Sequence, residues 1–213
     1  ANKFTIPIIP IGGSTGLVGG QIALQSNHVT LSLEKLDTIN FNKDSNLLYV
    51  QSGAILSNIK KLAFNNGRLF PLSLASEGSC QIGGNLATNA GGLNVIKYGN
   101  VRDLCLGLEA VLPCGQIVST MKPLKKNNMG FDLKNLLIGS EGTLGIITST
   151  ILKTFPIPKD PVSIFVSINN LADVLFVFEK ISREYSERIL AFELIKMTGI
   201  DFIEETGFTI KNP

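Results

Sequence analysis

The stretch QIGGNLATNAGG, residues 81–92, carries four glycines and two asparagines in twelve positions. Glycine loses more backbone entropy on folding than any other residue, so a glycine cluster destabilises a fold unless the backbone itself is needed. The usual need is a close approach of main-chain N–H groups to a phosphate or to a flat polar ligand. Ile82, Leu86 and Ala87 are interspersed as apolar anchors, which a flexible linker does not need. The stretch therefore predicts a binding site rather than a linker.

Another glycine-rich segment, GGSTGLVGG at residues 12–20, directly follows an apolar run typical of a strand. In chain order it is the first segment, and the stretch at 81–92 is the second. Its unhindered N–H groups could surround a pyrophosphate, with the hydroxyls of Ser14 and Thr15 as further donors. The segment lacks the Gly-Lys-Ser/Thr of a P-loop, and the chain continues toward a strand rather than the helix of a dinucleotide fingerprint. A plain glycine-rich turn fits this segment equally well.

The third segment, IGSEGTLGIIT at residues 138–148, has glycines that loosen the backbone just before an apolar strand. Glu141 is a lone carboxylate in this apolar context, and by itself the segment predicts only a turn with a capping glutamate. Taken together, these segments are interpreted as three glycine loops, each at the end of a strand, which can converge on one extended ligand with phosphates in its middle. A dinucleotide such as FAD has this shape.

The composition restricts the function classes. The 213 residues are 44% hydrophobic and carry a formal net charge of +2, which is too small to indicate a nucleic acid or a membrane surface as partner. The absence of tryptophan leaves few platforms for base stacking. No stretch is long and apolar enough to span a bilayer. We therefore expect a globular protein that binds no nucleic acid and spans no membrane.

Cysteine and histidine usage restricts the sites further. The three cysteines are an odd number without C-x-x-C spacing, which argues against a disulfide framework and a zinc site and favours a reducing, cytoplasmic compartment. His28 is the single histidine, so most histidine-based metal sites and catalytic triads are excluded from this sequence. We expect no metal site.

Periodicity predicts strands and helices in both parts of the chain, and the β-α-β-α order of the second part indicates an α+β domain. The linker signal PIPKDP at 156–161 separates a domain at 1–157 from a second one at 158–213. Because two strands do not make a stable sheet by themselves, the second domain is predicted to be incomplete. The expected elements are a half-buried strand at 29–33, a strand at 46–53, a helix at 54–67, two strands joined by a turn at 114–115, a short helix and a strand within 131–155, strands at 162–168 and 188–195, and helices at 171–185 and from about 198.

The motifs PIGGSTGLVGG (10–20), EGSCQIGGNLATNAGG (77–92) and NNMGFDLKNLLIGSEGTLGIIT (127–148) resemble, in this order and at these separations, the FAD-binding domain of the FAD-linked oxidases. The resemblance is to the group that includes D-2-hydroxyglutarate dehydrogenase, D-lactate dehydrogenase and the glycolate oxidase flavoprotein subunit. It is dense over residues 4–158. It implies an α+β FAD-binding domain of the vanillyl-alcohol-oxidase-like type, followed by the start of a ferredoxin-like α+β substrate domain.

The resemblance also implies FAD-binding residues. Some relatives attach the flavin to a histidine beside the first loop, and this sequence has none there, so the expected FAD binding is non-covalent. The first segment would hold the pyrophosphate, the second would pass along the flavin and ribityl chain, and the third would close the other side. The implied residues are Gly12, Gly13, Ser14, Thr15, Gly16, Gly78, Ser79, Gly83, Gly84, Thr88, Asn89, Gly91, Gly92, Glu141, Gly145, Ile146 and Ile147.

The implied activity is transfer of a hydride from C2 of a D-2-hydroxy acid to flavin N5, with no catalytic residue assigned in this sequence. His28 is distant in sequence from all glycine segments and is interpreted as an exposed turn residue. A salt bridge with Asp103 or another carboxylate is expected for Arg102, rather than a clamp on the substrate carboxylate. Cys80 is interpreted as a small packing residue.

Members of this family carry a segment before the first loop and a long C-terminal portion with metal ligands and the catalytic base. The sequence is therefore interpreted as a fragment, a cleaved product or one part of a split gene, inactive alone. The alternatives are a non-catalytic remnant, one half of a protein completed by a second chain or by homo-oligomerisation, and a different nucleotide- or phosphate-binding module.

Overall fold

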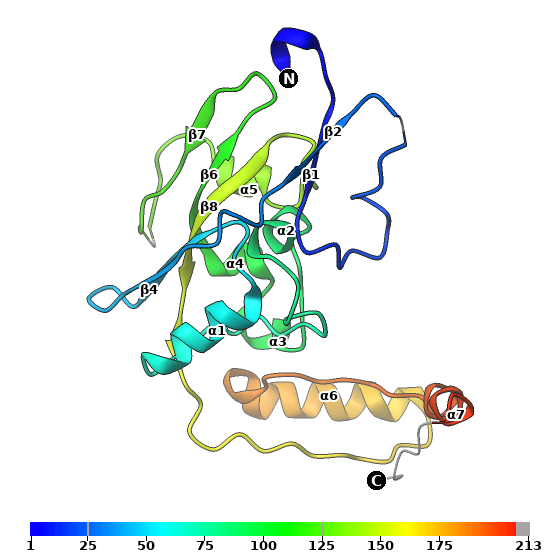
Figure 1. The fold of residues 1–213 in the computed structure, drawn as a ribbon. Helices are drawn as coiled ribbons and strands as arrows, with labels where there is room; N and C mark the ends of the chain where they lie inside the picture. The colour runs from blue at the N-terminus through cyan, green and yellow to red at the C-terminus, as the bar shows by residue number, and fades with distance from the viewer. Residues whose placement is uncertain (25, 125, 208–213) are drawn as a thin grey trace. The chain divides into compact units, whose positions relative to one another are not determined.

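A computed structural model describes residues 1–24, 26–124 and 126–207 (Figure 1). The chain divides into two compact units, Ala1–Ile157 and Pro158–Pro213, which are called unit 1 and unit 2 and are described separately. That unit 1 is the domain that holds FAD and that unit 2 begins a substrate domain stays a prediction.

A central antiparallel sheet organises unit 1. Within the described residues five strands pair in the order β3-β4-β8-β6-β7, and every neighbouring pair runs antiparallel. Strands β4 and β8 therefore lie side by side, although more than ninety residues of the chain separate them. The strand bounds are Ile39–Asn42 (β3), Leu47–Gln51 (β4), Cys105–Val111 (β6), Ile117–Ser119 (β7) and Ile146–Lys153 (β8).

Short helices gather beside this sheet (Figure 1). Helix α1 contacts β3 and β4, α2 contacts β4 and β8, and α4 contacts β6. The second glycine stretch therefore lies against the middle of the sheet. The helix bounds in unit 1 are Asn2–Phe4 (η1, a 3-10 helix), Leu56–Asn65 (α1), Ile82–Ala87 (α2), Val95–Tyr98 (α3), Val101–Leu104 (α4) and Leu133–Leu137 (α5).

The hydrophobic core lies between the sheet and these helices. Leu48 on β4 is opposite Leu152 on β8, and both are fully buried together with Ile82 and Leu86 of α2. Thr150 is the polar exception on this sheet face, and its hydroxyl donates to the Gly107 carbonyl at 3.0 Å. Alternation along β4 thus places Leu48 and Val50 on one buried face, as the period of a strand requires, whereas β8 is buried on both faces from Thr150 to Leu152.

Several predicted elements are confirmed. The predicted helix at 54–67 is α1, and it ends before Gly67, whose φ of 70° lies in the left-handed region that favours glycine. The predicted pair of strands around 114–115 is β6 and β7, joined by a turn in which Gly115 has a φ of 86°. The short helix and strand predicted within 131–155 are α5 and β8.

Two predictions in unit 1 are wrong. The second glycine stretch is not a loop, because Ile82–Ala87 is helical, with Ile82 and Leu86 one turn apart in the core. Burial of these anchors overrides the low helix propensity of glycine. The strand β2 (Val29–Ser32) forms as expected but is exposed rather than half-buried, because it pairs only with β1 (Ile8–Ile11) in a separate two-stranded parallel sheet.

Unit 2 is helical in its described residues. Helix α6 (Leu171–Tyr185) begins at Asn170, whose side chain accepts a hydrogen bond from the Asp173 N–H at 2.9 Å, as an N-cap does. A 3-10 helix η2 (Ser186–Arg188) and helix α7 (Met197–Glu205) follow, while the remaining two-stranded sheet, β5 (Arg68–Leu69) with β9 (Phe155–Pro156), belongs to unit 1.

The prediction of two strands in unit 2 is wrong. Residues 162–168 and 188–195 carry no strand assignment, although both runs are apolar, and Val162 is 81% exposed. A strand needs a neighbour for its backbone N–H and C=O groups, and these runs are not paired with each other. None of the helices among the described residues is long and apolar enough to cross a membrane.

The cysteines yield a prediction about thiol reactivity. Cys80 and Cys105 are buried and Cys114 is exposed, and burial raises the pKa of Cys105 above its ordinary value of 9.0. At neutral pH one thiol is expected to react quickly with a chromogenic disulfide reagent, and two more only after unfolding. Cys114→Ser should remove the fast phase; two fast thiols in the folded protein would contradict the burial of Cys80 or Cys105.

The same burial gives a pH dependence. Above its ordinary pKa the Cys105 thiol ionises in the unfolded chain but stays protonated in the folded one, so the unfolded state loses the proton first. The free energy of unfolding should therefore fall as the pH rises toward about 10, and the fall should be smaller in Cys105→Ala. Urea unfolding at a series of pH values measures this slope.

Candidate functional site

The three glycine segments line one pocket of unit 1, with a volume of about 300 Å³. They reach it from the end of β1, from α2 and from the turn before β8, so the tertiary fold brings together positions more than a hundred residues apart. The predicted site residues that line it are Gly12, Gly13, Ser14, Thr15, Gly16, Gly83, Gly84, Thr88, Glu141, Gly145, Ile146 and Ile147.

The first segment is a tight turn that touches the second. A Cβ on Gly13 would lie 2.1 Å from the Ser79 carbonyl oxygen, a distance that no side chain tolerates. Ser14 adopts a left-handed φ of 53°, and the Gln21 side-chain amide donates to the Gly16 carbonyl at 3.1 Å. The turn therefore exposes main-chain groups to the pocket in an arrangement of the kind that surrounds phosphates.

Helix α2 uses its glycines for two different purposes. A Cβ on Gly83 would lie 2.5 Å from the Ser52 Cβ at the end of β4, so this glycine lets the helix pack closely against the sheet. A Cβ on Gly84 would meet nothing within 4 Å, so this glycine leaves space on the pocket side. One face of the helix is thus packed on the core and the other is left open for a ligand.

Two amide side chains at α2 carry buried acceptors without a partner. The Oδ1 atom of Asn85 and the Oε1 atom of Gln81 are buried in the pocket lining and accept no hydrogen bond from the described residues. Asn85 as a whole is 5% exposed. Leaving such a group unsatisfied costs about 1–3 kcal/mol, which is a reason to expect a ligand that donates hydrogen bonds here.

The third segment turns into the pocket at Glu141. Its backbone has a φ of 53°, and its N–H donates to the Ala87 carbonyl at 2.8 Å, while the Gly139 N–H donates to the Leu86 carbonyl at 3.0 Å. A Cβ on Gly20 would lie 3.8 Å from the Glu141 Oε2 atom, so the carboxylate extends toward the first segment. Glu141 therefore stands between the end of α2 and the first glycine turn.

Five predicted residues do not line the pocket. The Asn89 side chain accepts a hydrogen bond from the Arg102 N–H at 3.2 Å, and a Cβ on Gly92 would lie 2.1 Å from the Ser73 carbonyl oxygen. These positions hold segments of the chain together rather than face the cavity. The five residues outside the lining are Gly78, Ser79, Asn89, Gly91 and Gly92.

Gln81 and Asn85 are two pocket residues that the sequence analysis missed. Both lie inside the quoted stretch, four residues apart, and this spacing places two side chains on one side of a helix. The signal was present, but interpreting the stretch as a loop hid it. Gln21, Ser52, Ser76 and other neighbours in the lining were also not predicted.

Three further sequence interpretations meet the structure here. Cys80 is 1% exposed in the core, as predicted for a packing residue. His28 directly precedes β2, is partly rather than fully exposed, and is not in the pocket lining. The salt bridge expected for Arg102 is wrong: its guanidinium donates to the backbone carbonyls of Asn135 and Ile138 instead.

The sequence of this chain matches a family model described as an FAD binding domain over residues 1–121. The chain belongs to this family. The matched region contains both the turn after β1 and the α2 stretch. The resemblance to FAD-linked oxidases is confirmed.

Curated relatives match nearly the whole chain. The chain is 34% identical over 216 residues to a D-2-hydroxyglutarate–pyruvate transhydrogenase of Saccharomyces cerevisiae, with 99% of this chain and 43% of the relative covered. It is 37% identical over 193 residues to the mitochondrial D-2-hydroxyglutarate dehydrogenase of Rattus norvegicus, with 91% and 36% covered. The chain thus spans about two fifths of the length of these relatives.

Solved structures share the fold. An alkyldihydroxyacetonephosphate synthase superimposes with a TM-score of 0.66 at 27% identity, over 75% of this chain and 29% of the other. The grass pollen allergen Phl p 4, with glucose dehydrogenase activity, superimposes with a TM-score of 0.63 at 22% identity, over 74% of this chain and 32% of the other, and shows the fold alone. The predicted α+β fold of an FAD-binding oxidase is confirmed.

The pocket residues fit FAD in their chemistry. FAD offers hydrogen-bond donors on its isoalloxazine ring, its hydroxyls and its adenine, which suit the unpartnered acceptors of Gln81 and Asn85. Its pyrophosphate suits the exposed main chain of the Gly12–Gly16 turn. Among the described residues, no group of three or more His, Cys, Asp or Glu could hold a metal ion.

Asn85→Leu is expected to separate stability from FAD binding. It replaces a buried amide of similar size, so the free energy of unfolding of the FAD-free chain should stay constant or rise by about 1 kcal/mol. The Kd for FAD should rise about 10-fold or more, because a hydrogen-bond acceptor to the ligand is lost. Urea unfolding and an FAD fluorescence titration measure the two effects.

Asn94→Leu is the matched control. The Asn94 amide donates to the Pro71 carbonyl at 2.8 Å and lies outside the pocket lining, so its loss should reduce stability by about 1 kcal/mol and leave the Kd for FAD unchanged. Wild-type FAD affinity in Asn85→Leu would contradict the assignment of the orphaned acceptor to the cofactor.

Proposed function

We propose that unit 1 binds FAD non-covalently in the pocket formed by the three glycine segments, and that the chain is the FAD-binding portion of a flavin-dependent D-2-hydroxyacid dehydrogenase. The observation that carries the first part is the pocket lined by all three glycine segments together with Gln81 and Asn85, whose buried side-chain oxygens have no partner in the described chain. Without a ligand, burial of these two oxygens would destabilise the fold, because no hydrogen bond replaces those they make to water.

The roles divide by chemistry. The main chain of Gly12–Gly16 is proposed to hold the pyrophosphate, and the amides of Gln81 and Asn85 are proposed to accept hydrogen bonds from the cofactor. Gly84 leaves the space for a flat ring system, and Glu141 lines the pocket between the end of α2 and the first segment. Non-covalent attachment is supported by the position of the single histidine, His28, outside the lining.

The proposed reaction follows from the names of the relatives, which are dehydrogenases and a transhydrogenase of D-2-hydroxyglutarate. Bound FAD would supply the acceptor for a hydride from C2 of a 2-hydroxy acid. The described pocket lining contains no Lys, Arg or His, so this pocket offers neither a cationic clamp for the substrate carboxylate nor a histidine base. The contribution of unit 1 is therefore to bind and orient the cofactor.

The test is a visible absorption spectrum of the purified chain before and after incubation with FAD and removal of free ligand. Flavin absorbance retained in stoichiometric amount is expected. Acid precipitation should then release the flavin into the supernatant, whereas flavin that stays with the pellet would indicate a covalent bond, for example to Cys80 in the lining. A protein that keeps no FAD would overturn the proposal.

Competition discriminates the alternatives. Displacement of FAD by ADP or inorganic pyrophosphate at equal concentration would favour a general phosphate-binding module over a flavoprotein. A D-2-hydroxy acid that bleaches the bound flavin would support the dehydrogenase, and a stable flavin spectrum with every such acid would favour a non-catalytic remnant. A second chain or homo-oligomer that completes the protein, and a cytoplasmic location, stay predictions.

A further inference from the structure

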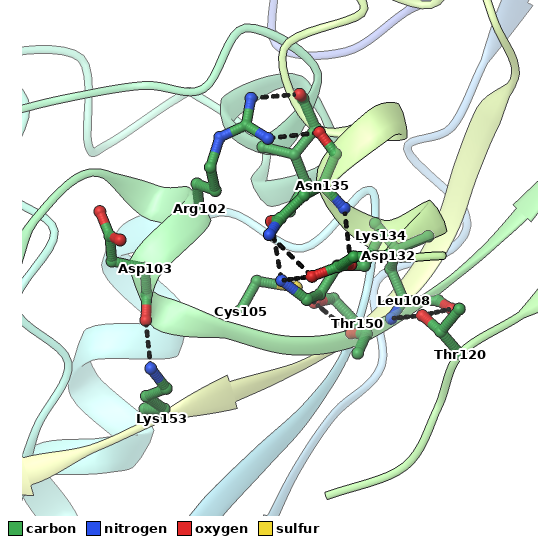
Figure 2. Close-up of polar contacts among 12 residues, drawn as sticks. Arg102, Asp103, Cys105, Leu108, Thr120, Asp132, Lys134, Asn135, Thr150 and Lys153 are labelled. Atoms are coloured by element: carbon green, nitrogen blue, oxygen red, sulfur yellow. Dashed lines mark hydrogen bonds and ion pairs between the residues drawn. The ribbon is translucent and has the colours of Figure 1, made fainter. Parts of the chain in front are cut away.

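Arg102 on α4 connects two parts of unit 1 without touching the pocket. Figure 2 shows its guanidinium directed at two backbone oxygens at the C-terminal end of α5. It donates to the carbonyl of Asn135 and, at 2.6 Å, to the carbonyl of Ile138. A planar guanidinium that makes two hydrogen bonds fixes direction as well as distance, which an ammonium group cannot do.

The two carbonyls need this donor because the chain leaves the helix at that point. The Asn135 carbonyl would receive the Gly139 N–H in a continuing helix, but Gly139 has a φ of 83° and its N–H donates to the Leu86 carbonyl instead. A Cβ on Gly139 would lie 3.0 Å from the Arg102 Nη2 atom. Arg102 thus stabilises the end of α5 where the third glycine segment begins.

Arg102 is itself held in place by the second segment. Its N–H donates to the Asn89 side chain at 3.2 Å, and the Val101 N–H donates to the Ala90 carbonyl at 3.0 Å. A capping box between Asn100 and Asp103 holds the first turn of α4, with the Asn100 N–H donating to Asp103 at 2.9 Å. The side chain therefore extends from an anchored helix.

We propose that Arg102 is a positioning residue that fixes residues 139–145 against α2, and so places Glu141 at the FAD pocket. The Glu141 N–H bonds to Ala87, three residues beyond the carbonyl that Arg102 holds. The expected effect on FAD binding rests on the proposed function. The effect of Arg102 on the position of residues 139–145 does not, because it concerns the chain without cofactor. Arg102 acts through Glu141 and its neighbours, because it does not line the pocket.

Hydrogen exchange on the FAD-free chain tests whether Arg102 holds residues 139–145 in place. In Arg102→Ala, peptides covering 138–145 should exchange about 10-fold faster or more, because a charged donor to two carbonyls is lost, while peptides of α1 keep their wild-type rates. Millimolar methylguanidinium should restore slow exchange in that segment. Arg102→Lys keeps the charge and one hydrogen bond, so it should exchange at an intermediate rate.

Arg68→Ala is the matched control. Arg68 also donates two hydrogen bonds to another segment, to the Thr154 hydroxyl at 3.1 Å and to the Thr154 carbonyl at 3.0 Å, but it lies outside the pocket lining. The Arg68→Ala variant should lower the unfolding midpoint without a selective increase in the hydrogen-exchange rate of peptides covering 138–145. In the FAD titration, Arg102→Ala should raise the Kd about 10-fold, methylguanidinium should lower it again, and Arg68→Ala should match the wild type.

The outcomes separate the two proposals. If the wild-type chain binds no FAD, the proposed function fails, and the exchange rates still decide whether Arg102 holds the segment. If Arg102→Ala shows wild-type exchange at 138–145, or only the uniform increase seen in Arg68→Ala, the inference is overturned. If Arg102→Ala does not fold, Arg102→Lys with its intermediate rate carries the same test.

Discussion

Gly13→Ala is expected to destabilise unit 1 strongly and to abolish FAD retention. The added Cβ would lie 2.1 Å from the Ser79 carbonyl oxygen and 3.0 Å from the Cys80 Cα, and both are main-chain atoms that no rotamer change can move. Forcing the turn and the segment before α2 apart should cost on the order of 3 kcal/mol and open the pocket. Urea unfolding of the FAD-free chain and the visible spectrum after FAD addition measure the two effects.

Gly78→Ala is the comparison for stability. An added Cβ there would meet nothing within 4 Å, and Gly78 is not among the glycines with positive φ. Its free energy of unfolding should change by less than about 1 kcal/mol. Equal stability in the Gly13 and Gly78 variants would contradict the close contact between the first two glycine segments.

Leu86→Ala is expected to lower the free energy of unfolding of unit 1 by about 3 kcal/mol. Leu86 is fully buried in the core on the sheet-facing side of α2, and its removal leaves a cavity beneath the helix that carries Asn85. FAD affinity should fall as well, because the orientation of α2 depends on this anchor. Denaturant unfolding followed by an FAD titration in the absence of denaturant tests both statements.

Leu17→Ala supplies the control with the same chemical change. Leu17 is 99% exposed in the described chain, so its truncation removes almost no packing, and the free energy of unfolding should stay within about 0.5 kcal/mol of the wild type. A loss in Leu86→Ala no larger than that in Leu17→Ala would show that α2 does not depend on core packing.

Local structure in unit 1 was predictable because its signals are local. The apolar stripe of α1 has the period of a helix and ends at Gly67, and the strands β6 and β7 are joined by a turn that needs a left-handed residue at Gly115. These elements depend on neighbours in sequence, and the structure contains them within a residue or two of the predicted positions.

The wrong predictions share a dependence on partners distant in sequence. Ile82–Ala87 became a helix because Ile82 and Leu86 are buried on the sheet, which outweighs the glycines between them. Residues 162–168 and 188–195 have the composition of strands, yet strand structure requires a paired neighbour and these runs are not paired with each other.

For the site, the sequence showed three glycine segments in an order and at separations typical of an FAD-binding domain. The folded structure showed that all three segments line one pocket, with Gly91 and Gly92 outside it. It also showed that the acceptors of Gln81 and Asn85 have no partner among the described residues, and that Arg102 binds carbonyls rather than a carboxylate. The physical reason is that glycine spacing is a property of the chain, whereas burial and the satisfaction of a polar atom depend on which distant segments the fold brings beside it.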